Sequence, residues 1–116
     1  QLNAKKDRSL LDTVVICPDD AACNKAWEKV EEYVRKYATT RLQMLSDSII
    51  MSAAPLKDDD ISLTASRILY KDRPGAELFM DLQCKPSPRG TEHCQTDQVE
   101  QIRVGFKQYL ADSVNQ

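Results

Sequence analysis

The four cysteines are the residues of this sequence whose types and spacing most directly suggest chemistry. They form two pairs, Cys17 and Cys23 in "CPDDAAC" and Cys84 and Cys94 in "CKPSPRGTEHC". Paired cysteines can exchange electrons, bind zinc or form structural disulfides. The spacing within each pair, together with the neighbouring residues, indicates which of these uses the sequence favours.

Neither redox chemistry nor zinc binding fits the two pairs well. A thioredoxin-like centre has C-x-x-C spacing, whereas five residues separate Cys17 from Cys23. Asp19 and Asp20 place negative charge inside that loop and disfavour the thiolate that redox and metal chemistry need. Structural zinc ligands usually occur in tight knuckles with two to four residues between the cysteines, and neither the five-residue nor the nine-residue separation here fits well, even if His93 replaces one cysteine.

Structural disulfides explain the pairs better, and the favoured connectivity is Cys17–Cys23 and Cys84–Cys94. Both pairs share one layout, in which a strand, a cysteine, a short polar loop and the second cysteine precede a helix. Loop entropy does not select this connectivity. The loss of unfolded-state entropy would stabilise the fold by about 2.4 and about 2.8 kcal/mol for the two local disulfides, but by about 4.4 kcal/mol for a Cys17–Cys84 disulfide. The long-range pairings therefore remain open as alternatives.

No other residue carries a recognisable catalytic or ligand-binding pattern. His93 is the only histidine, and a Cys–His nucleophile would need a free thiol at Cys94, which we expect to be oxidised. The run "DDD" at 58–60 lacks the central Gly and terminal Glu of a calcium loop. Hydrolase, metalloprotease and phosphate-binding glycine motifs are absent. The sequence predicts no catalytic residue, no metal site and no cofactor, and hence a protein that is not an enzyme.

A strand and a long helix are expected to position the first cysteine pair. Residues 12–17, "DTVVIC", are β-branched and predict the strand. Asp19 and Asp20 supply an N-cap for an amphipathic helix of about five turns. Its apolar face recurs at three- and four-residue spacing and comprises Ala22, Cys23, Ala26, Trp27, Val30, Val34 and Tyr37.

The rest of the chain predicts three more strands and a second helix. Residues 39–55 indicate a strand with a bulge or one covered on both sides. Residues 61–70 and 76–84 alternate in polarity around a turn and predict a hairpin. Residues 85–93 predict a loop, after which Thr96 or Asp97 caps the second helix. The order β-α-β-β-β-α predicts an α+β two-layer sandwich with a mainly antiparallel sheet, both helices on one face, and two disulfides.

Length and charge set limits on domain organisation and partners. The chain has 116 residues and a net charge of −2, from 16 basic and 18 acidic residues spread along it. These values predict a single domain at 10–116 without the basic face of a nucleic-acid binder. Residues 1–9 are polar and are expected to be a flexible tether at the mature end of a longer precursor. A lipid anchor on a cysteine preceding this tether is one alternative.

The even number of cysteines indicates an oxidising compartment, and the absence of an N-x-S/T sequence favours a bacterial periplasm over eukaryotic secretion. The stretch "AWEKVEEYVRKYATTRLQMLSDSIIMSAAP", followed by a short hairpin that ends in cysteine, resembles small uncharacterised envelope proteins of proteobacteria, often outer-membrane lipoproteins. The resemblance covers residues 17–110 and contains no sharp motif. It implies a location in the cell envelope, peripheral to the membrane, and implies no activity.

One candidate binding surface lies on the outward side of the predicted hairpin. Phe79, Ile68 and Tyr70 share outward parity there, and Arg67 lies beside them. Apolar and aromatic side chains on an open sheet face are typical of a docking surface. The alternative is that a loop or the N-terminal segment covers them.

A second candidate is the disulfide-bounded loop at 85–93, in which Pro86, Pro88 and Arg89 would insert into a partner. We expect overall a non-enzymatic periplasmic domain that binds another envelope or secreted protein through the exposed face or an edge of its sheet. An inhibitor or immunity protein that blocks a secreted enzyme through this loop is the first alternative. A carrier that holds a small apolar ligand between sheet and helices is the second. The oligomeric state is left open.

Overall fold

In the computed structural model, residues 13–114 are described and form three helices and a five-stranded antiparallel sheet. The elements in chain order are β1 (Val15–Cys17), α2 (Asp20–Tyr37), β2 (Leu42–Leu45), β3 (Ile49–Ser52), β4 (Ile61–Leu69), β5 (Ala76–Cys84), α3 (Pro88–Cys94) and α4 (Asp97–Val114). The expected tether at residues 1–9 lies outside the described residues. The predicted α+β class, antiparallel sheet and two disulfides are confirmed.

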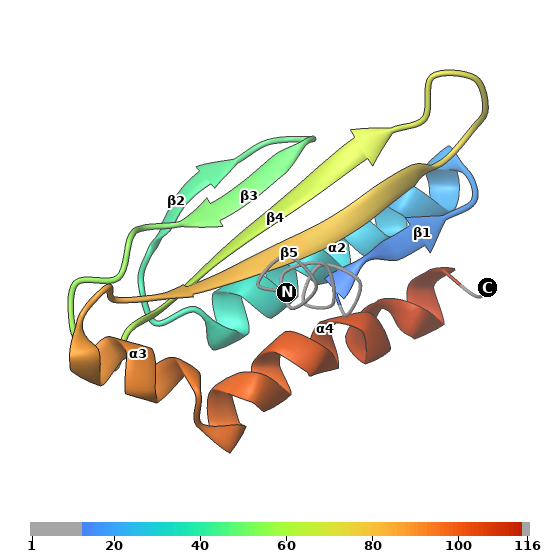
Figure 1. Ribbon diagram of the computed structural model, residues 1–116. Coiled ribbons are helices and arrows are strands. Elements are labelled where there is room, and N and C mark those ends of the chain that lie inside the picture. The colour runs from blue at the N-terminus through green and yellow to red at the C-terminus, as the bar shows by residue number, and fades with distance from the viewer. Residues whose placement is uncertain (1–12, 115–116) are drawn as a thin grey trace.

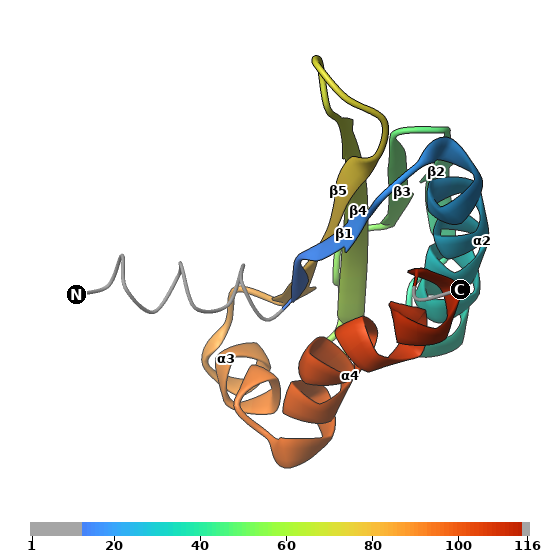
Figure 2. The ribbon, with the colours of Figure 1, turned by 90° about the vertical axis from the view of Figure 1, so that its right-hand side faces the viewer.

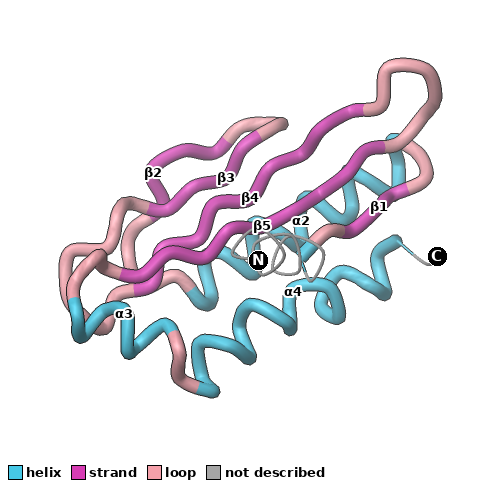
Figure 3. The backbone as a smooth tube through the Cα atoms, in the orientation of Figure 1, coloured by secondary structure: helices cyan, strands magenta, loops and turns pink. Residues whose placement is uncertain are grey.

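The sheet has the strand order β1-β5-β4-β3-β2, and α2 and α4 cover one of its faces (Figure 1). Figure 2 shows the sheet nearly edge-on, with both long helices on the same side. The nine-residue strands β4 and β5 form the middle of the sheet (Figure 3). Their register pairs Leu63 with Leu82 and Ala65 with Met80, so the inward row of each strand packs against the helices.

Helix α2 forms where the sequence predicts it and contributes much of the core. The Asp19 side chain accepts a 2.8 Å hydrogen bond from the Ala22 backbone N–H and so caps the first turn. Arg35 and Lys36 in the last turn complement the helix dipole. The buried face comprises Cys23, Ala26, Trp27, Val30, Tyr33 and Val34.

Helix α4 lies beside α2 and completes the covering layer. Thr96 precedes it, accepting a hydrogen bond from the Val99 backbone N–H at its hydroxyl. Val99, Ile102, Phe106 and Leu110 are buried at the spacing of one helical stripe. The core therefore lies between the two helices and the inward rows of the sheet.

The segment at 39–55 differs from the single strand expected, because it folds into the β2–β3 hairpin. The expected bulge is present, as a register shift between Leu42 and Met44. The turn follows from Ser46, whose hydroxyl accepts a 3.0 Å hydrogen bond from the Ile49 backbone N–H. Ser and Asp residues favour such turns, and here they interrupt an otherwise apolar segment.

The predicted loop at 85–93 contains the short helix α3, which is a correction to the sequence interpretation. Ser87 caps it by accepting a 3.0 Å hydrogen bond from the Gly90 backbone N–H, and Pro88 occupies the first helical turn. Proline is favoured there because its missing N–H has no partner in a helix anyway. Cys94 consequently ends α3, and the second disulfide does not lie at the start of α4.

The β4–β5 connection depends on one glycine. Gly75 has φ +102°, a left-handed conformation that residues with a side chain rarely adopt. A Cβ at this position would also overlap the Cys17 backbone carbonyl. Gly75 therefore lets the hairpin close against the end of β1.

Candidate functional site

The sheet face opposite α2 and α4 carries the outward side chains of every strand, and we call it the open face. In Figure 2 neither long helix lies on this side. The antiparallel register determines which side chains are neighbours across it. Its register-paired members are Ile16, Met44, Ile49, Met51, Ser62, Thr64, Ser66, Ile68, Glu77, Phe79, Asp81 and Gln83.

Apolar side chains on the open face come from all five strands. Glu77 lies between Ile16 and Ile68, which are 58% and 53% exposed. Ser66 lies between Phe79 and Ile49 in the next row. Large aliphatic side chains this accessible are costly to hydrate and are typical of interaction surfaces when they lie together.

The third row continues the apolar surface toward the β2 edge. Thr64 is paired with Asp81 on one side and with Met51 on the other, and Met51 is paired with Met44. Met44 is 45% exposed, and methionine adapts its shape to varied partners. The open face thus ends at an accessible, flexible side chain on an edge strand.

The charges on the open face have one sign. Glu77 and Asp81 are the ionisable side chains among its register-paired members, and both are acidic. Each is flanked by apolar or small polar residues across the strands. The arrangement suits a partner with apolar side chains and basic groups at matching spacing.

The structure brings together only part of the candidate surface expected from the sequence. Phe79 and Ile68 lie on the open face as expected. Arg67 points to the helix side, where its guanidinium lies 5.1 Å from the Trp27 ring centroid and donates a 3.1 Å hydrogen bond to Asn24 Oδ1. A second hydrogen bond, 2.7 Å long, reaches the Asp47 carbonyl. Arg67 therefore holds the β2–β3 turn against α2.

Tyr70 follows the last residue of β4 and belongs to the β4–β5 turn. The Arg73 guanidinium lies 4.2 Å from its ring centroid, and its backbone N–H donates to the Gly75 carbonyl at 3.1 Å. The Tyr70 hydroxyl is buried and has no hydrogen-bond partner among the described residues. The alternation of β4 predicts that Tyr70 points outward, but β4 ends at Leu69 and the turn packs the Tyr70 ring against the Arg73 guanidinium.

The second candidate surface is also rearranged. Pro86 lies between β5 and α3, whereas Pro88 and Arg89 belong to the first turn of α3. Ser87 donates a 2.8 Å hydrogen bond to Asp58 Oδ1, tying the start of this helix to the β3–β4 connection. The segment at 85–93 is consequently anchored at its base and offers no long insertion loop.

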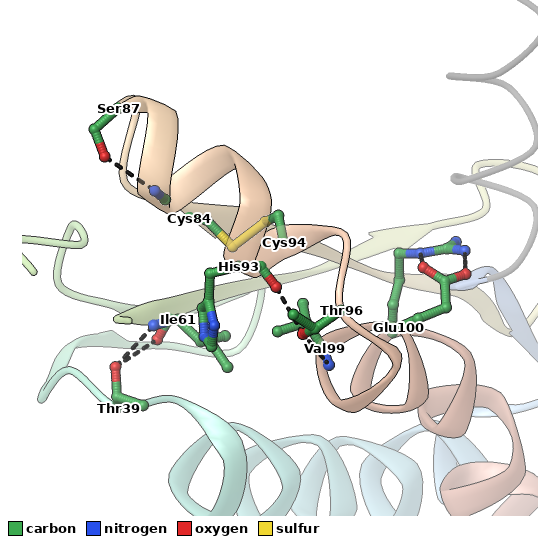
Figure 4. Close-up of a disulfide and its surroundings, with 11 residues drawn as sticks. Thr39, Ile61, Cys84, Ser87, His93, Cys94, Thr96, Val99 and Glu100 are labelled. Carbon is green, nitrogen blue, oxygen red and sulfur yellow. Dashed lines mark hydrogen bonds and ion pairs between the residues drawn. A yellow bond between two sulfur atoms is a disulfide. The ribbon is translucent and has the colours of Figure 1, made fainter. Parts of the chain in front are cut away.

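The two disulfides have the favoured pairing, Cys17–Cys23 and Cys84–Cys94. All four cysteines are thereby oxidised, so none is a thiol nucleophile. His93 is half-buried in the last turn of α3 rather than exposed in a loop. Figure 4 shows its imidazole pointing away from the Cys84–Cys94 disulfide. Its Nε2 atom has no hydrogen-bond partner within the described part of the chain.

Both edges of the sheet also offer backbone groups. β2 forms one edge, and β1 pairs only with Ala76, Glu77 and Leu78 of β5 at the other edge. The remaining residues of β5, from Phe79 to Cys84, have no strand partner on that side among residues 13–114. Unpaired strand edges can accept a strand from a partner.

Sequence reasoning missed Ile16, Ile49, Met44 and Met51 as members of the open face. Alternation within a strand shows which residues share a side, but it does not show which strands are neighbours. β1 pairs with β5, far away in the chain, and this pairing places Ile16 beside Glu77. Alternation in β1 could have identified Ile16, because its neighbours Val15 and Cys17 are buried and a residue between them points to the opposite face.

Comparisons with protein-family models, curated proteins and solved structures find no match to this chain. None of the helices among residues 13–114 is long and apolar enough to cross a membrane. Within the same residues, no group of three or more His, Cys, Asp or Glu side chains is placed to hold a metal ion.

Proposed function

We propose that this protein is a non-enzymatic interaction module of the bacterial periplasm that binds another envelope or secreted protein through its open face. The observation that carries the proposal is the set of accessible apolar side chains that the register brings together on the face that α2 and α4 do not cover. Ile16 and Ile68 do not contribute to the core, so folding does not explain their apolar character.

The compartment is inferred from the covalent structure. Two disulfides are consistent with an oxidising compartment, where such bonds persist. The resemblance of residues 17–110 to proteobacterial envelope proteins supports the periplasm in particular. A lipid anchor preceding residue 1 remains part of this proposal, and mass spectrometry of the native protein isolated from membranes tests it.

The partner is expected to combine apolar side chains with Lys or Arg. Glu77 and Asp81 lie beside the apolar members of the open face and would pair with such groups at the rim of an interface. Strand addition at β2 is a second mode by which the same partner can bind, because this edge is exposed. The open face and this edge meet at Met44.

The alternatives have less support. An inhibitor that inserts residues 85–93 into an active site would need a projecting loop, but Pro88 and Arg89 lie in α3. A carrier with its ligand between sheet and helices would need space that Leu63, Leu78, Phe106 and other buried side chains occupy.

Site-specific photocrosslinking in the native bacterium tests the proposal. A photoreactive residue at position 68 should trap one discrete envelope protein, whereas one at Leu56, which is 78% exposed in a loop, should not. The trapped protein, once purified, should bind Ile68→Thr at least tenfold more weakly than the unchanged chain and Leu56→Thr equally well. Equal binding of all three chains would contradict the proposed surface.

A further inference from the structure

A groove of about 550 Å³ lies between α2 and α4. From α2 it is lined by Tyr33 and Tyr37, which are one helical turn apart. The lining residues of α4 recur at three- and four-residue spacing and include Gln98, Gln101, Gln108 and Tyr109. The groove therefore follows α4 for about three turns and is bounded on the other side by one turn of α2, and this length along α4 suits an elongated ligand.

The floor of the groove is a cluster of tyrosines. The ring centroid of Tyr33 lies 4.6 Å from that of Tyr37 and 5.0 Å from that of Tyr109. Tyr33 is buried and donates its hydroxyl hydrogen to the Ile102 carbonyl. Burial also raises the pKa of Tyr33, so this side chain stays neutral. Tyr37 and Tyr109 are half-buried and keep part of their surface accessible.

No side chain that lines the groove carries a charge at neutral pH. Two cations outside the lining lie near its rings, with Lys36 Nζ 5.3 Å from the Tyr37 ring centroid and Lys29 Nζ 5.9 Å from that of Tyr109. Lys29 is paired with Glu32, which also accepts a hydrogen bond from the Tyr109 hydroxyl. An anionic group would thus find no cation in the groove itself, which favours a neutral ligand.

The three glutamines add hydrogen-bonding capacity that the protein itself does not use. Gln98, Gln101 and Gln108 are exposed, and their side-chain amides make no hydrogen bond within the described residues. Each amide offers two donor hydrogens and an acceptor oxygen. A ligand hydroxyl also donates and accepts, so a row of hydroxyls satisfies both ends of each amide.

We propose that this groove binds a neutral oligosaccharide. The C–H faces of the sugar rings would pack on Tyr37 and Tyr109, while the hydroxyls would bind the glutamine amides. A proline-rich peptide is the other elongated ligand that aromatic grooves bind. It offers carbonyl acceptors and few donors, which would leave the glutamine oxygens unpaired. The site is separate from the open face and does not depend on the function proposed for it.

The test is a titration of the isotope-labelled chain, followed by NMR of the glutamine side-chain amides. The probes are maltotriose, cellotriose and chitotriose at up to millimolar concentration, and a proline-rich decapeptide is titrated separately. At least one trisaccharide should shift the amide signals of Gln98, Gln101 and Gln108. The amide of Gln43, which is exposed on β2, should stay unchanged.

Two variants and a matched control make the result specific. Gln101→Leu removes both the donors and the acceptor and should weaken saccharide binding about tenfold. Tyr37→Leu keeps an apolar side chain but removes the aromatic face, and should weaken binding to a similar extent. Gln43→Leu and Ile68→Thr should leave the affinity unchanged. Absence of a shift with all three sugars, shifts with the peptide alone, or equal shifts at Gln43 would overturn the proposal.

Discussion

The two faces of the five-stranded sheet are built from alternate residues of the same strands and yet differ in how far their apolar side chains are exposed. On the face that α2 and α4 cover, Leu63, Leu78 and Ile50 are 0% exposed. On the open face, Ile68 and Ile16 are also aliphatic but are more than half exposed, at 53% and 58%. Burial in the core explains the apolar side chains of the covered face, but it does not explain those of the open face.

The difference in exposure separates residues that stabilise the fold from residues that are accessible to the proposed partner. Residues of the covered face are constrained by close packing, because any loss of volume leaves a cavity. Residues of the open face can change without disturbing that packing, so their apolar character points to a partner. Substitutions on either face, or at the connection between sheet and helices, should therefore change stability and binding to different extents.

Leu63→Ala should have the largest effect. Leu63 lies in the central strand and is completely buried, so its truncation should lower the free energy of unfolding by about 2 to 5 kcal/mol. Urea denaturation of both chains measures the difference. A loss below about 1 kcal/mol would mean that the covered face is not the principal core.

The two disulfides should differ in how much they stabilise the fold, because one is buried in the core and the other is only half-buried. Loop entropy gives them similar weight, about 2.4 kcal/mol for Cys17–Cys23 and about 2.8 kcal/mol for Cys84–Cys94. However, Cys17 and Cys23 are 0% and 1% exposed and belong to the core, whereas Cys84 and Cys94 are half-buried beside it.

We therefore expect the double substitution Cys17→Ala/Cys23→Ala to lower the free energy of unfolding more than Cys84→Ala/Cys94→Ala. The first change removes packed sulfur atoms as well as the cross-link. Both chains should still fold, which circular dichroism before denaturation checks. A larger loss for Cys84→Ala/Cys94→Ala would indicate that the entropy of the longer loop contributes more to stability than the burial of the sulfur atoms.

Asp60 should make the stability of the fold sensitive to acid, because its side chain helps to join the end of α2 to the start of β4. Hydrogen bonds from the backbone N–H groups of Lys57 and Leu56, and from the Thr39 hydroxyl, lower the pKa of Asp60. The carboxylate thus stabilises the fold above the unfolded-state pKa, about 3.9, and this stabilisation is lost as the pH falls through the lower folded-state value. Thr39 directly follows the cap of α2 and also donates its backbone N–H to Ile61 of β4.

Asp60→Asn removes the titration while keeping a side chain of similar shape. The melting temperature of the unchanged chain should exceed that of Asp60→Asn near pH 7, and the gap should narrow below pH 4. Asp59→Asn serves as the control, since Asp59 is an exposed neighbour in the same turn. A gap that stays constant down to pH 2 would argue against the role of the charged carboxylate.

The sequence predicts most of the covered face because local patterns determine it. The helical spacing of α2, the cap at Asp19 and the alternation in β5 each depend on residues close together in the chain. The disulfide pairing was favoured for a similar reason, namely the repeated local layout. These elements could be assigned without knowing which strands are neighbours.

The open face and the groove depend on information that a local pattern does not contain. The alternation in β4 places Arg67 on the covered face, but its contacts with Trp27 and Asn24 depend on where α2 packs against the sheet. Helix α3 was missed because Pro88 and Gly90 are typical of loops, although Ser87 followed by proline is also a helix start. The groove requires α2 and α4 to lie side by side, which only the packed structure provides.

Phe79→Ala should have the smallest effect on stability and a large effect on recognition. Phe79 lies on the open face opposite Ser66, outside the buried core, so the free energy of unfolding should fall by less than about 1 kcal/mol. Binding to the partner trapped by crosslinking should weaken at least tenfold, because aromatic side chains at the centre of an interface contribute strongly. Denaturation and calorimetric titration of the same preparation separate the two quantities. A loss of stability comparable to that of Leu63→Ala would show that the open face is covered in the native protein, and the contrast between the two faces would then no longer hold.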